Sequence, residues 1–381
     1  MGIQKVIAVI MVLLLLCSPL VTSAANQFPA LDAAAVVIYD ADFEQVLYAK
    51  NPNERRSIAS LTKIMTILVI CELIQSEKLS LNDVVTASAN AASRGGTEIK
   101  LSSGDKLTVE ELLYATALAS ANDAAVALAE YVSGSEKAFA ELMTKRAWEI
   151  GLTDTNFVDC TGLLSIFSGN FSTAYDMAVL SHYAMQNELF RQFVSTKEYT
   201  IKSLGRTIRN SNALLHEVEG VNGIKTGSTT PAGHTLITSA VRNGRHVIIV
   251  VLGAPSRESR NQQSRDLLEY TYDHLQTIIP KGATVTQVYI RDGVTHLVDA
   301  VLEQDLSIFV LNPEQTKVTT KTELASKRAP VEKGEQVGEL IVFVDDEEYG
   351  RVKLVANQST GLASVLRRLW NRIVEFFRSL F

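Results

Sequence analysis

Cysteine is scarce in this sequence: only three of its 381 residues are cysteines. This excludes a disulfide-rich scaffold and a multi-cysteine zinc site. Proline and glycine are also few, at 8 and 21, and 46% of the residues are apolar, so the chain is neither fibrous nor intrinsically disordered. Lysine and arginine (36) do not outnumber aspartate and glutamate (42), and the net charge of −6 gives no reason to expect nucleic acid as a partner.

Familiar catalytic signatures are missing as well. The sequence contains no G-x-S-x-G, H-E-x-x-H or C-x-x-C motif, and its six histidines show no spacing typical of metal ligands. If the protein is a hydrolase, its general base is therefore expected to be a residue other than histidine.

A short, strongly apolar segment opens the sequence. Residues 6–17 are VIAVIMVLLLLC, and the small residues Thr22-Ser23-Ala24-Ala25 offer a cleavage site after them. This segment is shorter than the roughly 20 residues that a membrane-spanning helix needs. We predict a cleaved signal peptide over residues 1–25, with an uncleaved anchor as the alternative.

Hydrophobic periodicity predicts a helix-rich region enclosed by strands. We expect strands over residues 35–40, 45–50, 234–241 and 245–252, the last two joined by a tight turn at Asn243-Gly244. Helical patterns cover residues 60–75, 108–119, 122–133, 135–149, 172–186 and 258–277. Strands that flank a mostly helical middle indicate an α+β fold, in which an antiparallel sheet carries segregated helices.

The pattern changes near Pro280. From there to about Asn357, short β-like runs alternate with turn signals, at residues 285–290, 294–302, 307–311, 336–344 and 350–355. We therefore predict a main domain over residues 26–279, followed by a separate small all-β domain over residues 280–357.

The C-terminal segment, residues 362–381, has a third pattern. Apolar residues recur in it at helical three- and four-residue spacing, and four arginines but one glutamate lie between them. Four arginines make a membrane-spanning helix costly. We predict an amphipathic helix that lies in the interface of an anionic membrane, with a helix packed on the β domain as the alternative.

An S-x-x-K pattern, Ser60-Leu61-Thr62-Lys63, begins the apolar helix predicted over residues 60–75. Residues three apart lie on one helix face, so Lys63 can accept the proton of Ser60 if its pKa is lowered. The pattern alone is weak, because roughly one or two copies arise by chance in a chain of this length. A second copy at residues 103–106 contains Gly-Asp, which is typical of a turn, so Ser60 is the preferred nucleophile.

Copies of the S-x-N pattern include residues 88–90, 120–122 and 168–170. Its middle copy, Ser120-Ala121-Asn122, interrupts two predicted helices. A short loop there can present a hydroxyl and an amide together to a cleft.

A single K-T-G pattern occurs, at Lys225-Thr226-Gly227. Its glycine allows a ligand to approach the backbone closely, and its lysine and threonine can bind a carboxylate. Taken alone, the pattern favours an edge strand that carries a solvated lysine.

In this order, S-x-x-K, S-x-N and K-T-G resemble the motifs of the active-site serine penicillin-recognising enzymes. Longer stretches, such as TVEELLYATALASANDAA and VNGIKTGSTTPAGHTL, are similar to the low-molecular-weight D-alanyl-D-alanine carboxypeptidases of the serine peptidase S11 family. The similarity covers about residues 30–278 and continues more weakly through the β region. Three departures from the usual residues, Ile58, Ala121 and Phe43-Glu44, replace no chemical group.

The resemblance implies a penicillin-binding/serine β-lactamase-like fold and a bacterial cell-wall enzyme. Its substrate would be the D-Ala-D-Ala end of peptidoglycan stems, β-lactams would acylate the same serine, and no cofactor or metal is implied. The enzyme would act on the outer face of the cytoplasmic membrane, held there by the C-terminal helix.

The resemblance also implies roles for single residues. Ser60 would be the nucleophile, Lys63 its general base, and Ser120 the relay of a proton to the leaving amine. Backbone N–H groups of Ser60 and Ser228 would form the oxyanion hole. The residues implied in substrate binding are Asn122, Lys225, Thr226, Gly227 and Ser228.

Three alternatives stay open at this point. A β-lactamase shares the motifs, a DD-endopeptidase or transpeptidase differs only in the acceptor or leaving group, and a penicillin-binding sensor would use the same cleft without turnover. Pairing of Cys71 with Cys160 and the oligomeric state also stay open.

Overall fold

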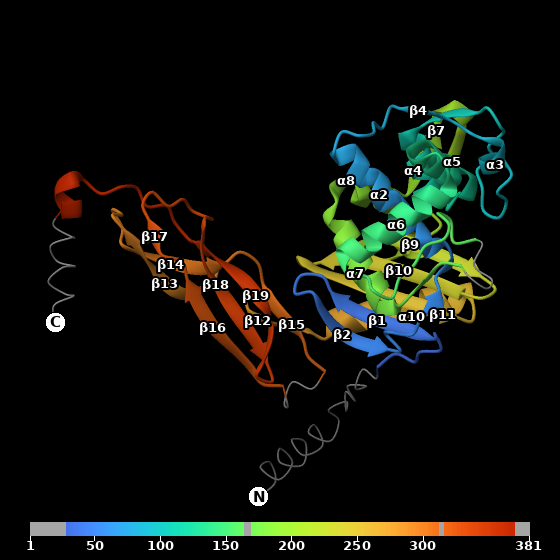
Figure 1. Cartoon of the computed structure of the whole chain (residues 1–381). Helices are drawn as coiled ribbons and strands as arrows, with labels where there is room; N and C mark the ends of the chain where they lie inside the picture. The colour runs from blue at the N-terminus through green and yellow to red at the C-terminus, as the bar shows by residue number, and fades with distance from the viewer. Residues whose placement is uncertain (1–27, 164–168, 312–315, 370–381) are drawn as a thin grey trace, which may run out of the picture. The chain divides into compact units, whose positions relative to one another are not determined.

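The structure is a computed structural model, and it describes residues 28–163, 169–311 and 316–369 (Figure 1). The predicted signal peptide lies outside the described residues. So do Ser168 of the S-x-N copy at 168–170 and residues 370–381 of the predicted C-terminal helix.

A five-stranded antiparallel sheet organises the first part of the chain, in the order β2-β1-β11-β10-β9. The strands are β1 (Ala35–Asp40), β2 (Gln45–Lys50), β9 (Val221–Thr229), β10 (Gly233–Arg242) and β11 (Arg245–Ala254). Four of them confirm predicted strands, and the fifth, β9, carries K-T-G along an edge. Asn243 and Gly244 have φ angles of 50° and 76°, as the predicted two-residue hairpin turn requires.

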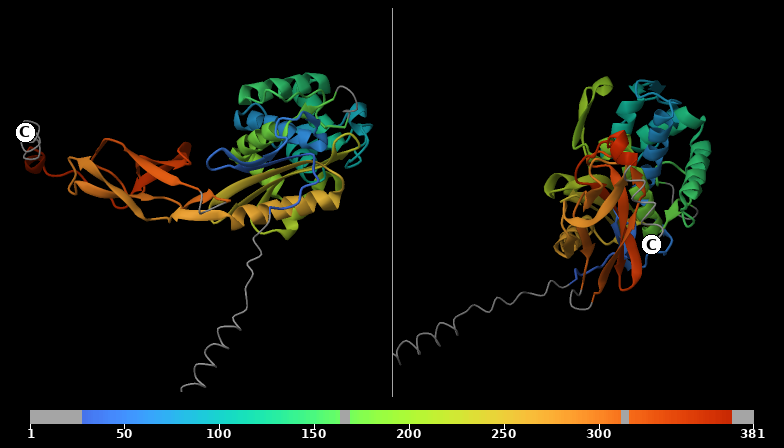
Figure 2. Two further views of the ribbon diagram at one scale, coloured as in Figure 1. Left: turned by 90° about the horizontal axis from the view of Figure 1, so that it is seen from below. Right: turned by 90° about the vertical axis from the view of Figure 1, so that its left-hand side faces the viewer.

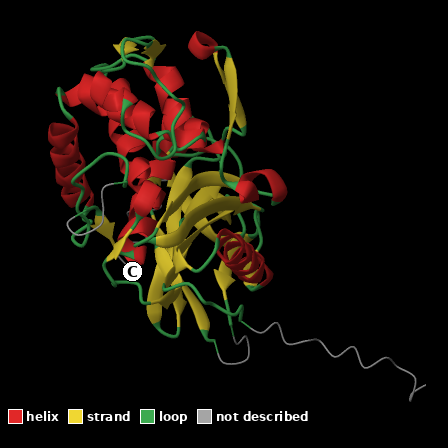
Figure 3. Cartoon of the chain, turned by 90° about the vertical axis from the view of Figure 1, so that its right-hand side faces the viewer, coloured by secondary structure: helices red, strands yellow, loops and turns green. Residues whose placement is uncertain are grey.

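Helices cover both faces of this sheet. A cluster lies on one face and α10 lies on the other (Figure 3). The cluster contains α2 (Lys63–Gln75), α4 (Val109–Leu118), α5 (Asn122–Ser133), α6 (Glu136–Ile150), α7 (Ala174–Gln186) and α8 (Glu188–Ser195), while α10 spans Arg257–Asp273. This arrangement confirms the predicted antiparallel sheet with segregated helices.

Helix α2 is the centre of the helical cluster. It follows a short 3-10 helix, η1 (Ala59–Thr62), and every side chain from Lys63 to Cys71 is buried. Helices α4, α5, α6, α7 and α8 all contact it. The nearly uniform apolar sequence of this segment therefore predicted its burial correctly.

The second part of the chain, coloured orange to red in Figures 1 and 2, consists of strands around a hydrophobic core of their own. A six-stranded sheet has the order β16-β18-β19-β14-β13-β17. Its strands are β13 (Thr284–Arg291), β14 (Leu297–Leu302), β16 (Val318–Leu324), β17 (Lys327–Arg328), β18 (Gln336–Val344) and β19 (Glu347–Ala356). The predicted all-β character is confirmed.

Two predictions of secondary structure were wrong in detail. The helix expected over 258–277 ends at Asp273, and Leu275–Ile279 form a strand, β12, which pairs with β15 (Leu306–Phe309). The β-branched run Thr277-Ile278-Ile279 favours a strand over a helix end. Helix α8 and the hairpin of β7 (Glu198–Ile201) and β8 (Arg206–Arg209) were not predicted from the sequence.

In the part of the chain that the structure describes, no helix has both the length and the apolar character to cross a bilayer.

Candidate active site

Ser60 and Lys63 lie side by side at the junction of η1 and α2. The Lys63 Nζ is 3.1 Å from the Ser60 Oγ. Lys63 is fully buried, whereas Ser60 is partly exposed. The predicted one-turn spacing therefore brings a reachable hydroxyl against a buried amine.

Lys63 makes two more hydrogen bonds, both to carbonyl-type oxygens. Its Nζ lies 2.7 Å from Asn122 Oδ1 and 2.9 Å from the backbone oxygen of Thr161. A neutral amine has two N–H bonds and one lone pair. When both N–H bonds point at Asn122 and Thr161, the lone pair faces the hydroxyl of Ser60.

The charge state of Lys63 follows from its surroundings. Burial lowers the pKa of Lys63 from its ordinary value of 10.5 to about 8, although Asp159 and Asp123 act in the opposite direction. Near pH 8 a substantial fraction of Lys63 is neutral and able to accept a proton.

The S-x-N motif occupies the loop between α4 and α5, as predicted. Ser120 adopts a left-handed backbone conformation, with a φ of 57°, and is nearly buried. Asn122 is the first residue of α5, and its side chain also donates to the Gly95 carbonyl at 2.9 Å. The amide of Asn122 thus connects Lys63 to the loop that contains Gly95 and Thr97.

The K-T-G motif lies on the edge strand β9, against η1. Lys225 is buried, and burial together with the neighbouring Lys63 lowers the pKa of Lys225 well below its ordinary value. The hydroxyl of Thr226 lies 3.0 Å from the hydroxyl of Ser211. A Cβ on Gly227 would lie 3.1 Å from the Ser60 nitrogen, so the predicted close approach at this glycine is present, although here to protein backbone.

These motifs converge on one cleft of ≈ 390 Å³. Its lining residues are Ser60, Thr97, Ala119, Ser120, Ser211, Thr226, Gly227, Ser228, Arg257, Arg260 and Asn261. Lys63, Asn122 and Lys225 are buried beside it. The structure therefore brings all eight predicted site residues together.

Two arginines of α10 belong to the same cleft and were missed by the sequence analysis. Arg260 is buried, and its guanidinium donates to the Thr235 carbonyl at 3.3 Å. Burial and the neighbouring Arg257 lower the pKa of Arg260 to about 10, so it keeps its charge near neutral pH. Arg257 and Arg260 give the cleft a positive end that suits a carboxylate. No signal in the helical pattern separated them from ordinary solvated arginines.

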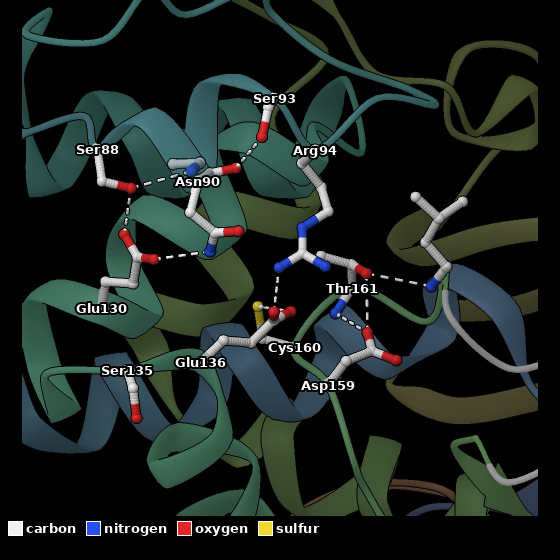
Figure 4. Close-up of polar contacts among 12 residues, drawn as sticks. Ser88, Asn90, Ser93, Arg94, Glu130, Ser135, Glu136, Asp159, Cys160 and Thr161 are labelled. Carbon is white, nitrogen blue, oxygen red and sulfur yellow. Dashed lines mark hydrogen bonds and ion pairs between the residues drawn. The ribbon is translucent and has the colours of Figure 1, made fainter.

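Two other S-x-N copies have structural roles. The Ser88 hydroxyl accepts from the Ala91 nitrogen at the start of α3 (Ala89–Ala92) and donates to Glu130, which also binds Asn90 (Figure 4). Asn170 is buried and donates to the Thr62 hydroxyl at 2.9 Å.

Two further observations concern the cysteines and possible metal ligands. Cys71 and Cys160 are both buried and unpaired, so they form no disulfide. Among the described residues, no three His, Cys, Asp or Glu side chains gather as they would around a metal ion.

Comparison with known proteins gives matches along most of the chain. The family model of the D-alanyl-D-alanine carboxypeptidases, Peptidase S11, matches residues 22–256, and that of the penicillin-binding protein 5 C-terminal domain matches residues 274–361. D-alanyl-D-alanine carboxypeptidase DacF of Bacillus subtilis is 35% identical over 91% of both chains.

Solved structures agree with these matches. Penicillin binding protein 5 of Haemophilus influenzae superposes with a TM-score of 0.67 at 29% identity, covering 88% of this chain and 99% of that one. A mutant of the DD-transpeptidase of Streptomyces K15 gives a TM-score of 0.61 at 31% identity over 65% of this chain and all of that one.

Proposed function

Since the chain belongs to the Peptidase S11 family of D-alanyl-D-alanine carboxypeptidases, it is a serine hydrolase of the penicillin-binding class, and we propose that Ser60 is its nucleophile. The substrate is the D-Ala-D-Ala end of a peptidoglycan pentapeptide stem, from which the terminal D-alanine is removed. The observation that carries the assignment is the contact between Ser60 and a buried Lys63 whose other two hydrogen bonds direct its lone pair to the hydroxyl.

Acylation begins when neutral Lys63 takes the proton of the Ser60 hydroxyl. The Oγ bonds to the carbonyl carbon of the penultimate D-alanine, and the backbone N–H groups of Ser60 and Ser228 receive the oxyanion. The close approach of Gly227 to the Ser60 nitrogen supports this pairing of η1 with β9.

Breakdown of the tetrahedral intermediate expels the terminal D-alanine. Its nitrogen receives a proton through Ser120, the C–N bond breaks, and an ester remains on Ser60. Water then hydrolyses the ester and regenerates the serine. A β-lactam forms the same ester at Ser60 when its ring amide bond opens.

Substrate binding is assigned to the rest of the cleft. Asn122 orients the substrate amide, and Lys225 and Thr226 bind the carboxylate of the terminal D-alanine. Thr226 lines the cleft and Lys225 is buried beside it, and Arg257 and Arg260 add positive charge to the cleft.

The function is tested by incubating the purified protein with a pentapeptide muropeptide and weighing the products by mass spectrometry. Loss of one alanine is expected. Cleaved cross-links would identify an endopeptidase, transfer to an added amine a transpeptidase, and rapid turnover of a chromogenic cephalosporin a β-lactamase. Covalent labelling by penicillin without any of these reactions would identify a sensor.

We further propose that the protein is exported and held at the outer face of the cytoplasmic membrane by an amphipathic C-terminal helix. The described start of that segment supports this. Ser364 precedes a helical turn at residues 365–369, in which Val365, Leu366 and Leu369 are 71%, 81% and 57% exposed. Exposed Val294 and Leu297 lie on the β13–β14 hairpin, whose turn contacts residues 361–363.

The proposed division of the chain is a signal peptide over 1–25, a catalytic domain over 26–279, a β domain over 280–357 and the helix over 362–381. The pairing of β12 with β15 favours moving residues 275–279 into the β domain.

A further inference from the structure

A short loop between α6 and α7, residues 159–162, presents three successive carbonyl groups to side chains; we refer to it as the Asp159 loop. The Asp159 oxygen accepts from Asn170 Nδ2 at 3.0 Å, and the Cys160 oxygen accepts from the Thr66 hydroxyl at 2.8 Å. The Thr161 oxygen accepts from Lys63 Nζ at 2.9 Å. Because Lys63 and Thr66 are one turn apart on α2, the loop is fixed along the face of the helix that carries the proposed base.

The same loop is in tight contact with η1. Gly162 has a φ of 79°, and a Cβ there would lie 1.9 Å from the Ala59 oxygen and 2.8 Å from the Thr62 hydroxyl. Ala59 precedes Ser60, and Thr62 precedes Lys63. Any displacement of the loop therefore displaces the residues on which the proposed chemistry depends.

The side chain of Asp159 fixes this loop internally. Its Oδ1 accepts from the Thr161 nitrogen at 2.6 Å and the Thr161 hydroxyl at 2.8 Å (Figure 4). The same oxygen accepts from the Gly162 nitrogen at 2.6 Å. Asp159 is fully buried, and its Oδ2 accepts no hydrogen bond from any residue that the structure describes. Oδ1 thus sets the orientation of the Thr161 peptide. Oδ2 carries negative charge that no neighbouring hydrogen-bond donor among the described residues offsets.

We propose that Asp159 is a positioning residue for Lys63, acting through the Thr161 carbonyl and through its own charge. The carbonyl takes one N–H of the neutral amine, so that the lone pair stays on Ser60. The negative charge stabilises the ammonium that forms as Lys63 accepts the serine proton. This inference rests on the proposed function, in which Lys63 is the general base.

The anionic groups that face Lys63 come from two elements. Asp159 belongs to the loop, and Asp123 lies in the first turn of α5, where it accepts from the nitrogens of Ile99 and Leu101. Both carboxylates oppose the effect of burial on the pKa of Lys63. Lys225 on β9 also faces Lys63, and burial together with the charge of Lys63 lowers the pKa of Lys225 well below its ordinary value.

The remaining titratable groups nearby are Cys160, Glu136 and Arg94. Burial raises the pKa of the Cys160 thiol well above its ordinary value, so the thiol is neutral near pH 8. It lies 3.4 Å from Glu136, whose carboxylate forms an ion pair with Arg94 (Figure 4). Among the described residues, Asp159 and Asp123 are therefore the carboxylates that act on Lys63 without an ion-pair partner of their own.

The experiment compares second-order acylation rates with fluorescent penicillin between pH 5.5 and 9.5. The full-length variants are Asp159→Asn, which keeps an acceptor oxygen for the loop but removes the charge, and Asp159→Ala, which removes both. The acylation rate is expected to rise with pH as Lys63 loses its proton, and we call this rise the acid limb. In Asp159→Asn the midpoint of the acid limb is expected to fall by roughly one pH unit, because the loss of the negative charge lowers the pKa of Lys63. Its plateau is expected to fall by about 3- to 10-fold, because a less basic amine is a weaker general base.

In Asp159→Ala the Thr161 carbonyl is no longer held, and a plateau loss of about 10²-fold is expected. Asp176→Asn is the matched control. Asp176 is also a buried carboxylate, on α7, where it accepts from the Thr155 hydroxyl and the Asp154 nitrogen, and its variant should keep the wild-type acid limb.

The inference is overturned if Asp159→Asn keeps the acid limb and the plateau rate of the wild type. It is also overturned if the acid limb of Asp176→Asn moves as far as that of Asp159→Asn. If Asp159→Ala does not fold, the comparison of Asp159→Asn with its control still decides. Failure of the proposed function is separate: wild-type protein would then show no acylation at Ser60 at any pH.

Discussion

Gly227 and Ser60 are in such close contact that a Cβ built on Gly227 would lie 3.1 Å from the backbone nitrogen of Ser60. The same atom would lie 2.6 Å from the Thr235 hydroxyl and 3.1 Å from the Ile58 oxygen. Two of these three neighbours are backbone atoms, which cannot rotate away. The glycine of K-T-G is therefore required because the edge strand and the nucleophile share this space.

Gly227→Ala should separate β9 from η1 by a few tenths of an ångström and misalign the proposed oxyanion hole. We expect acylation by fluorescent penicillin to slow by about 10²-fold. Gly361→Ala is the control, since a Cβ at Gly361 would meet no atom within 4 Å. An alanine variant at 227 that acylates at the wild-type rate would contradict the explanation.

Ser60→Ala should lose both D-alanine release and covalent penicillin labelling, because no other hydroxyl among the described cleft residues is hydrogen-bonded to a buried amine. Ser103→Ala should keep both activities: the second S-x-x-K copy lies in a turn before β5 (Lys106–Thr108), outside the cleft. Mass spectrometry of the penicillin-labelled peptide checks the assignment. Labelling that survives in Ser60→Ala would refute it.

Lys63 should give acylation an acid limb with an apparent pKa of about 8. Below that pH Lys63 is an ammonium and cannot accept the serine proton, so the rate should rise with pH and level off above it. Lys63→Arg should be inactive, since a guanidinium stays protonated at every working pH. A flat profile between pH 6 and 9, or an active arginine variant, would remove Lys63 as the base.

Arg245 and Asp40 form a buried ion pair between β11 and β1, with 4% and 0% of their side chains exposed. Burial raises the pKa of Asp40 while Arg245 opposes that rise. Arg245→Met should lower the free energy of unfolding by about 3–5 kcal/mol, because it leaves Asp40 buried without its partner. Arg209→Met breaks a surface pair with Glu198 and should cost about 1 kcal/mol or less. Urea unfolding measures both variants, and equal losses in the free energy of unfolding of Arg245→Met and Arg209→Met would contradict this prediction.

The sequence predicted those parts of the molecule that repeat a pattern. The apolar run of α2 predicted its burial, and the three-residue spacing of Ser60 and Lys63 predicted their contact. The Asn243-Gly244 turn fixed the pairing of β10 with β11.

What stayed unpredicted depends on backbone groups and tertiary packing. The Thr161 carbonyl holds Lys63, yet every residue has a carbonyl, so nothing in the identity of Thr161 indicates this contact. In the sequence, Arg260 has the pattern of an ordinary polar helix residue. It lines the cleft only because α10 packs against β10. The loop at 159–162 has no periodicity at all, and its position is set by Asp159 and Gly162.

The C-terminal segment should hold the protein on anionic vesicles without contributing to catalysis. Ala363 is buried and its nitrogen donates to the Asp292 backbone oxygen at 2.9 Å, so a truncated protein should end at Ser364 to leave the β domain intact. The truncated protein should remain in the supernatant with anionic vesicles and keep full activity on a small D-Ala-D-Ala peptide. The intact protein should sediment with vesicles that contain phosphatidylglycerol, and high salt should weaken this binding without abolishing it, because arginine–headgroup attraction is screened while burial of apolar side chains is not. Leu366→Ser with Leu369→Ser should weaken binding at every salt concentration, since both side chains are exposed and apolar. Truncated protein that still sediments, or that loses activity on the small peptide, would favour a helix packed on the β domain instead.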